Sequence, residues 1–238
     1  MSIIKDIIVF VVLLGANLIQ AITGFAGTLI AMPPTIKLIG VTEAKALLNV
    51  VAQISCLLIV ITGWKHINWK EFFKMFVLMA VGMLIGIRIF EIAPMKNLLV
   101  AYGMMIVVIA LCKLFLKKEL ELPGWVMLLV ILAAGIIHGM FVSGGALLVI
   151  YAASVLKEKE EFRATMALIW VTIGCYITGQ QIMLGSFDSH VIFLLIIGLI
   201  PVFAGTWIGT KLVKKINQSM FEKMTYILLL LSGILAIV

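Results

Sequence analysis

Charged residues are scarce in this chain, and their scarcity decides its class. Only 12% of the 238 residues are Asp, Glu, Lys or Arg, whereas 64% are hydrophobic. A soluble domain of this size needs a more highly charged surface, and apolar runs of about eighteen or more residues are typical of membrane spans. Because the runs are continuous and do not alternate with polar residues, they predict membrane helices and exclude a β-barrel. The longest polar stretches, 113–122 and 157–163, have the length of connecting loops and leave no room for a soluble domain.

Cysteines and acidic residues are also few, which argues against metal and redox chemistry. Cys56, Cys112 and Cys175 lie within or at the edge of apolar segments at unrelated spacing, so we interpret them as small apolar helix residues. The sequence shows no metal-ligand cluster and no nucleophile–base arrangement, and we expect no cofactor, no metal and no enzymatic activity. The net charge of +7 does not indicate a nucleic-acid partner, because the basic residues lie at the ends of apolar runs.

The hydrophobic pattern predicts an all-α integral membrane protein. Ten apolar segments are expected: 7–22, 25–39, 43–63, 70–90, 97–116, 124–141, 144–156, 162–184, 189–210 and 219–238. Six of them are long enough to span a bilayer, namely 43–63, 70–90, 97–116, 162–184, 189–210 and 219–238. The remaining four form two pairs, each interrupted by a Gly-rich break. A single helix over residues 3–39 would be about 55 Å long against a hydrocarbon core of about 30 Å, so each pair must either fold back as a hairpin or bend.

The Gly-rich breaks belong to a segment that appears twice. The break TGFAG at 23–27 returns as VSGG at 142–145, and a Glu-x-basic-Ala pattern follows at the same distance, at 43–46 and 161–164. Breaks of a helix inside a membrane are costly, because lipid offers no partners to the freed backbone groups. A duplicated break therefore indicates the working site of the protein.

The distribution of basic residues favours two hairpins over two bent crossings. If both pairs return to their starting side, thirteen basic residues lie on one face and five on the other, whereas single crossings give seven against eleven. The positive-inside rule prefers the first arrangement, with loops 64–74, 113–123, 157–162 and 211–218 in the cytoplasm and both termini outside. We therefore expect two inverted repeats, 1–118 and 119–238, each a broken-helix hairpin plus three transmembrane helices. Inverted repeats support alternating access around a midplane site.

Helix starts at the two breaks can bind an anion. The first N–H groups of a helix have no partner inside it, and they carry roughly half a positive charge. Glycines in the breaks would let the backbone approach a ligand, although close helix packing is an alternative explanation for them. The predicted substrate-binding residues are Asn17, Gln20, Thr23, Gly24, Phe25, Gly27, Thr28, His138, Ser143, Gly144 and Gly145. Asn49 and Gln53 are further candidates to line the path.

Three ionisable residues have candidate roles in moving an anion. His138 is the counterpart of Gln20 and is the ionisable residue expected at membrane depth, where it either carries a proton or only fixes helix contacts as a neutral ring. Lys45 and Arg163 occupy equivalent positions in the two copies. They are candidates for attracting anions at the pore entrances, and interfacial cations that snorkel to the headgroups are the simpler alternative.

At these residues the chain resembles the TauE/SafE family of bacterial membrane transporters, the sulfite exporter-like permeases. The resemblance rests on AITGFAG at 21–27 with Pro33 and Pro34 downstream, on GMFVSGG at 139–145 followed by VIY at 149–151, and on the two-copy layout. The chain departs from the family pattern at Ala26 and Thr28, where glycine is frequent, and at Ala146, where Gly-Gly-Pro is frequent.

The resemblance implies a secondary transporter for a small sulfur-containing oxyanion, sulfite or a short organosulfonate such as sulfoacetate. Its expected location is the cytoplasmic (inner) membrane of a bacterium, as a multi-pass protein. Its expected partners are the small anion, the lipid bilayer and, as a candidate coupling ion, the proton, and no particular oligomeric state is indicated. The alternative is a passive small-anion channel, which would share most of these features.

Overall fold

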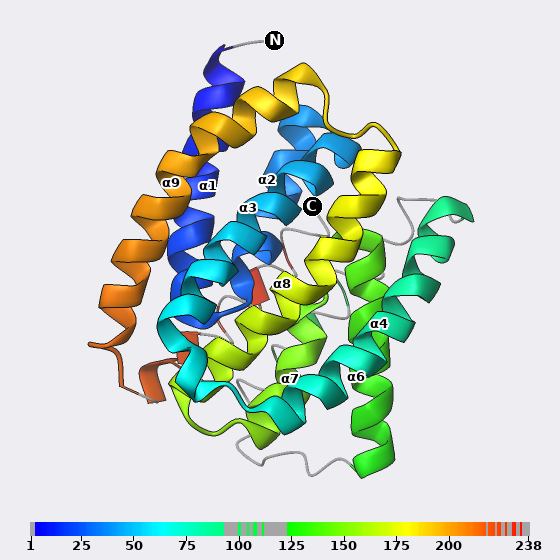
Figure 1. Ribbon diagram of the computed structural model, residues 1–238, viewed down its shortest axis with the longest axis vertical. Helices are drawn as coiled ribbons and strands as arrows, with labels where there is room; N and C mark the ends of the chain where they lie inside the picture. The colour runs from blue at the N-terminus through cyan, green and yellow to red at the C-terminus, as the bar shows by residue number, and fades with distance from the viewer. Residues whose placement is uncertain are drawn as a thin grey trace.

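The computed structural model describes residues 3–92 and 123–217, with scattered positions between 100 and 111 and between 219 and 234. Within this part of the chain all regular secondary structure is helical. The elements are α1 (Ile3–Thr23), α2 (Ala26–Ile39), α3 (Val41–Gly63), the 3-10 turn η1 (Trp64–His66), α4 (Trp69–Ile92), α6 (Gly124–Phe141), α7 (Gly145–Val155), α8 (Lys159–Met183) and α9 (Ser189–Val213) (Figure 1). The all-helical prediction is thus confirmed for these residues.

The helix boundaries follow the predicted apolar segments closely. Every predicted segment within the described residues is a helix, whereas 97–116 and 219–238 lie largely outside them. Six described helices are long and apolar enough to cross a membrane: α1, α3, α4, α6, α8 and α9. This set differs from the prediction, because α1 begins at Ile3 and reaches 21 residues, and α6 has 18 residues. Both are therefore long enough by themselves, while their partners α2 and α7 are short apolar helices of 14 and 11 residues.

Both broken pairs fold back as hairpins. The start of α2 lies against α1, so that a Cβ on Gly27 would stand 2.6 Å from the carbonyl oxygen of Ala16. The start of α7 lies against α6 in the same way, with Gly144 packed on the carbonyl of Ala134. In Figure 1 α1 descends from the N-terminus and α2 returns upward, whereas α6 rises from the opposite end and α7 returns downward. A bent single crossing is therefore excluded for both pairs.

The connecting loops gather at two ends of the helix bundle. At the lower end in Figure 1, Asn68 after η1 donates a hydrogen bond to Glu161 (2.8 Å), and Lys159 donates to the carbonyl of Ile216 beyond α9 (2.7 Å). At the upper end, Nε2 of His190 lies 3.0 Å from Asp6 near the N-terminus. Three of the four loops predicted to share the cytoplasmic side therefore lie together, and the described N-terminal residues lie at the other end.

Glycines allow the long helices to pack in two matching pairs. Gly205 of α9 packs on the backbone of α1 at Leu14 and Leu18, and Gly209 packs on Leu18. In the other pair, Gly82 of α4 packs on the backbone of α6 at Leu132 and Ile136, and Gly86 packs on Ile136. Each α6 contact lies 118 positions after its α1 equivalent. Close backbone approach of this kind is how membrane helices associate without a hydrophobic driving force between them.

Helices α3 and α8 cross at the centre of the bundle. α8 is the most buried of the described candidate spans, at 61% against 33–44% for the others. Asn49 of α3 donates hydrogen bonds to the carbonyl of Gly174 (3.2 Å) and to Thr178 (2.8 Å) of α8. The two hairpins end on either side of this crossing, which brings their breaks to the same place.

Candidate functional site

The break of the first hairpin is closed by side chains of its own segment. Gly24 has a φ of 83°, a left-handed conformation that favours glycine, and its N–H donates to the carbonyl of Gln20 (2.7 Å). The hydroxyl of Thr23 accepts a hydrogen bond from the N–H of Ala26 (3.1 Å), and Oε1 of Gln20 accepts one from the N–H of Gly27 (2.9 Å). The start of α2 therefore already has partners for these two N–H groups.

The second break has the same turn, but the hydrogen bonding at the start of the following helix is different. Val142 adopts the left-handed conformation here (φ 54°), and its N–H donates to the carbonyl of His138 (2.7 Å). This confirms the predicted equivalence of Gly24 with Val142 and of Gln20 with His138. Among the described residues, no side chain accepts a hydrogen bond from the first-turn N–H groups of α7. The two helix starts are thus unequal in what they offer to a ligand.

After the break, the residues of the two hairpins that occupy equivalent positions in space differ by one from those that the sequence repeat pairs. Gly144, and not Gly145, takes the position of Gly27, because it packs on Ala134 and His138 as Gly27 packs on Ala16 and Gln20. Between the left-handed residue and this packed glycine the second hairpin therefore has one residue fewer, although three residues separate α6 from α7 and two separate α1 from α2. Gly27 and Gly144 are required for helix packing, since a Cβ at either position would collide with a backbone carbonyl at 2.6 Å or 2.1 Å. Close helix packing therefore explains why these two positions are glycine.

The tips of the two hairpins meet at Phe25 and Gly145. A Cβ on Gly145 would lie 3.1 Å from the ring of Phe25, and Phe25 also makes an edge contact with Phe162 of α8. The starts of α2 and α7 converge as expected for a shared site. Their meeting point forms one side of a small cavity.

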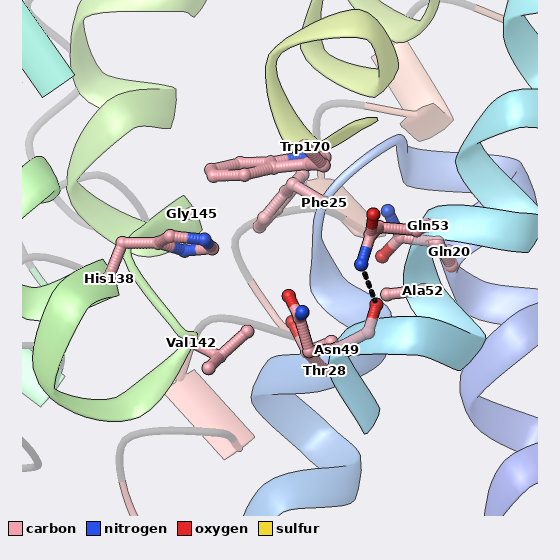
Figure 2. A pocket seen from close by; sticks show the side chains of 10 residues that line it. All are labelled: Gln20, Phe25, Thr28, Asn49, Ala52, Gln53, His138, Val142, Gly145 and Trp170. Atoms are coloured by element: carbon pink, nitrogen blue, oxygen red, sulfur yellow. Dashed lines mark hydrogen bonds between the residues drawn. The ribbon is translucent and has the colours of Figure 1, made fainter. Parts of the chain in front are cut away.

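The cavity lies among both hairpin tips, α3 and α8 (Figure 2). It offers about 10 Å³ to the centre of a water molecule, which is the space of roughly one water. Its lining residues are Gln20, Phe25, Thr28, Asn49, Ala52, Gln53, His138, Val142, Gly145 and Trp170. Five predicted binding residues therefore share one cavity, and Asn49 and Gln53 line it as proposed. Asn17 and Gly27 line a second small cavity behind Gln20 and Thr28.

One wall of the cavity is made of amides held by hydrogen bonds. Nε2 of Gln53 donates to the hydroxyl of Thr178 (2.5 Å), which also accepts from Asn49. Nε2 of Gln20 donates to the carbonyl of Gly24 (3.1 Å) and lies 3.0 Å from the thiol sulfur of Cys56. These side chains are positioned before any ligand arrives.

The opposite wall carries His138 and Trp170. His138 is 4% exposed, and its ring stacks on Trp170 with centroids 5.1 Å apart. Neither ring nitrogen has a hydrogen-bond partner among the residues that the structure describes. Nε1 of Trp170 donates to the carbonyl of Gly24 (2.8 Å), which joins α8 to the first break. Figure 2 shows the imidazole of His138 facing the cavity from the second hairpin, across from the amides.

The remaining predicted residues lie outside the main cavity. Thr23 closes the start of α2, Ser143 donates to the carbonyl of Phe141 (3.0 Å), and Asn17 donates to the carbonyl of Leu13 (2.7 Å). Gly24 contributes its backbone carbonyl to Trp170 and Gln20.

The two cations at equivalent positions are both engaged within the protein. Arg163 is 4% exposed, and its guanidinium contacts the carbonyl of Ala21, the carboxylate of Glu160 and the hydroxyl of Thr210. Lys45 lies over the ring of Phe90 at 3.7 Å. A role of either cation in attracting anions stays a prediction.

Sequence reasoning missed Trp170, whose indole forms a wall of the cavity. Trp64, Trp69, Trp125 and Trp207 are 52–67% exposed, as interfacial anchors should be, whereas Trp170 is 7% exposed. Trp170 lies in the middle of a predicted span, and its equivalent in the first copy of the repeat is the small residue Ala52. This difference is the signal that could have identified it. No group of three or more His, Cys, Asp or Glu side chains within the described residues could hold a metal ion.

Comparison with known proteins agrees with this membrane architecture. A sequence model of the family described as sulfite exporter TauE/SafE matches residues 8–236, which is nearly the whole chain. Searches of curated proteins and of solved structures returned no significant match. With its multi-pass helical fold, its paired helix hairpins and this match across both halves, the chain belongs to the TauE/SafE family of sulfite exporters.

Proposed function

We propose that this protein is a secondary transporter of a small sulfur-containing oxyanion, sulfite or a short organosulfonate such as sulfoacetate. It works by alternating access in the cytoplasmic membrane of a bacterium, coupled to an ion gradient. The observation that carries the proposal is the polar cavity at the meeting point of the two hairpins, in a chain of the TauE/SafE family. Helix starts and neutral amides around a small cavity suit an anion that must shed its water.

Alternating access in this proposal depends on two antiparallel repeats, residues 1–118 and 119–238. Three matches support them: the left-handed residues Gly24 and Val142, the reversed hairpins in Figure 1, and the glycine contacts of α9 on α1 and of α4 on α6. The positive-inside rule assigns the cytoplasm to the end where η1 and the start of α8 meet. The two repeats would then rock around the cavity to expose it to either side.

The small size of the cavity favours a transporter over an open channel. A space of about 10 Å³ holds roughly one water, so an oxyanion with three oxygens requires the hairpin tips to separate. Movement for each ion carried is the property of a transporter.

Flux measurements in proteoliposomes test the proposal. Purified protein with a pH gradient imposed should accumulate labelled sulfite or sulfoacetate above the outside concentration, and the accumulation should collapse when the gradient is dissipated. Strictly downhill flux at channel-like conductance would identify a passive anion channel instead. Absence of any sulfur-oxyanion flux, with correct insertion verified, would overturn the proposed function.

We also propose the proton as the coupling ion and His138 as its carrier. The imidazole is the ionisable group that lines the cavity, and its ordinary titration range lies near neutral pH. His138→Gln keeps a hydrogen-bonding side chain that cannot titrate, so transport should lose its pH dependence while substrate still binds. An unchanged pH profile in this variant would remove His138 from the coupling mechanism.

A further inference from the structure

The two hairpins offer unequal partners to an anion. In the first, the N–H groups of Ala26 and Gly27 are already taken by Thr23 and Gln20. Gln20 is also committed to the carbonyl of Gly24 through its other amide atom. An anion that bound here would first have to displace hydrogen bonds that hold the hairpin closed, each contributing about 1 kcal/mol.

The second hairpin has unused hydrogen-bonding groups at the equivalent place. Among the described residues, no side chain accepts a hydrogen bond from the first turn of α7, an 11-residue helix that begins at Gly145 on the cavity wall. His138 faces the same cavity while 4% exposed, and within the described part of the chain both of its ring nitrogens lack a hydrogen-bond partner. Buried polar groups are nearly always hydrogen-bonded, so this imidazole indicates a partner that the described part of the chain does not supply.

We propose that the start of α7 and His138 form the anion subsite, and that it takes one singly charged oxyanion head, a sulfonate or hydrogensulfite. The first hairpin forms the fixed opposite wall through Phe25, Thr28 and Gln20. This inference rests on the proposed transport function and specifies which half of the cavity binds the charge. The sequence pattern placed both helix starts at one anion, and this proposal assigns the charge of the anion to the second of them.

The charge of the ligand follows from the small amount of positive charge that acts on the subsite while His138 is neutral. Among the described residues that line the cavity there is no Lys or Arg. Lys45 acts on His138 electrostatically from outside this lining, where its ammonium lies over the ring of Phe90, and Arg163 is paired with the carboxylate of Glu160. A helix start contributes roughly half a charge, and a neutral imidazole contributes one hydrogen-bond donor. These suffice for a monoanion, whereas a buried dianion would keep an uncompensated charge at high cost.

The aromatic stack provides a direct optical readout of this subsite. Trp170 stacks on His138, and it is 7% exposed while the other four tryptophans are 52–67% exposed. An anion on His138 therefore changes the environment of the buried indole. Ligand-dependent emission should be absent in Trp170→Phe, which identifies the source of the signal.

The experiment is a titration of purified full-length protein with three anions, namely isethionate (a monoanionic sulfonate), sulfate and acetate, followed by tryptophan emission and thermal unfolding. Wild-type protein should bind isethionate at least about tenfold more tightly than sulfate. His138→Phe keeps the stack on Trp170 but has no ring nitrogen, and it should weaken isethionate binding by about tenfold or more. His138→Gln, which restores a donor, should remain within about threefold of wild type. His66→Phe on the exposed turn η1 is the matched control, with wild-type affinity expected.

The outcomes separate this inference from the proposed function. If wild-type protein binds isethionate and His138→Phe binds it equally well, the subsite is wrong while the transporter proposal stands. Equal or tighter binding of sulfate would overturn the monoanion assignment. If neither isethionate nor sulfate binds but acetate does, and His138→Phe loses acetate binding, the subsite is supported and the sulfur-containing substrate is rejected. Absence of binding for all three anions would overturn both.

Discussion

The indole Nε1 of Trp170 donates a hydrogen bond of 2.8 Å to the carbonyl oxygen of Gly24, joining residues 146 positions apart. This bond connects the central helix of the second half to the break of the first hairpin. The same indole stacks on His138 of the second hairpin. Trp170 therefore links both breaks, and any relative movement of the two hairpins must change its contacts.

Trp170→Phe should weaken the connection between the two breaks without leaving a large cavity in the protein core. The variant keeps an aromatic ring for His138 but removes the donor to Gly24, whose carbonyl retains Gln20 as a second donor. We expect a loss of about 1 kcal/mol in unfolding free energy, because one net hydrogen bond disappears. Thermal unfolding in detergent measures it, and Trp207→Phe, at an exposed position, serves as the control. Equal melting temperatures for the two variants would contradict the importance of the bond.

Gly144 and Gly145 are neighbours with opposite expected effects. A Cβ on Gly144 would lie 2.1 Å from the carbonyl of Ala134, so Gly144→Ala should lower stability by about 1–3 kcal/mol through forced separation of α6 and α7. A Cβ on Gly145 meets the ring of Phe25 at 3.1 Å, at the edge of the cavity. Most of the Gly145→Leu protein should therefore still fold, but flux should be abolished because the leucine side chain fills the cavity.

The two glycine variants are compared by size-exclusion profile and by proteoliposome flux. Gly15→Ala is the matched control, because no atom lies within 4 Å of the added Cβ. Wild-type flux in Gly145→Leu would contradict the location of the substrate cavity.

The equivalent glycines of α4 and α9 test the two-fold organisation. A Cβ on Gly82 would stand 2.1 Å from the carbonyl of Leu132, and one on Gly205 would stand 2.8 Å from that of Leu14. Both Gly82→Ala and Gly205→Ala should destabilise by about 1–3 kcal/mol, with the larger effect at Gly82, since its contact is closer. Thermal unfolding compares them with Gly179→Ala, where nothing lies within 4 Å. A stabilised Gly82→Ala would show that α4 and α6 do not pack in this way.

Arg163→Lys separates a structural role from anion attraction. The guanidinium reaches Ala21, Glu160 and Thr210 at once, and an ammonium on a flexible stem cannot reproduce this fork. We expect a loss of about 2 kcal/mol or more in stability, although the charge is kept. If anion attraction were its main role, Lys would preserve flux and stability together. Melting temperature and flux measured on the same preparation distinguish the two cases.

The class of the molecule and the location of its breaks could be predicted from the sequence. Apolar runs, their lengths and the spacing of Gly24 and Val142 are local properties, because a helix and its interruption depend on neighbouring residues and on the lipid around them. The equivalence of Gln20 and His138 also followed from spacing alone. The hairpin form of both pairs followed from the placement of basic residues, and the structure agrees.

Which groups at the breaks already have hydrogen-bond partners depends on the tertiary structure. Gln20 closes its own hairpin, whereas its counterpart His138 has no hydrogen-bond partner in the described ranges, and no pattern in the sequence distinguishes these two outcomes. The structure also shows that Trp170 lines the cavity and that the guanidinium of Arg163 is hydrogen-bonded within the protein. These are contacts between residues more than a hundred positions apart or between separate helices. They depend on how the helices pack in three dimensions, which local periodicity does not contain.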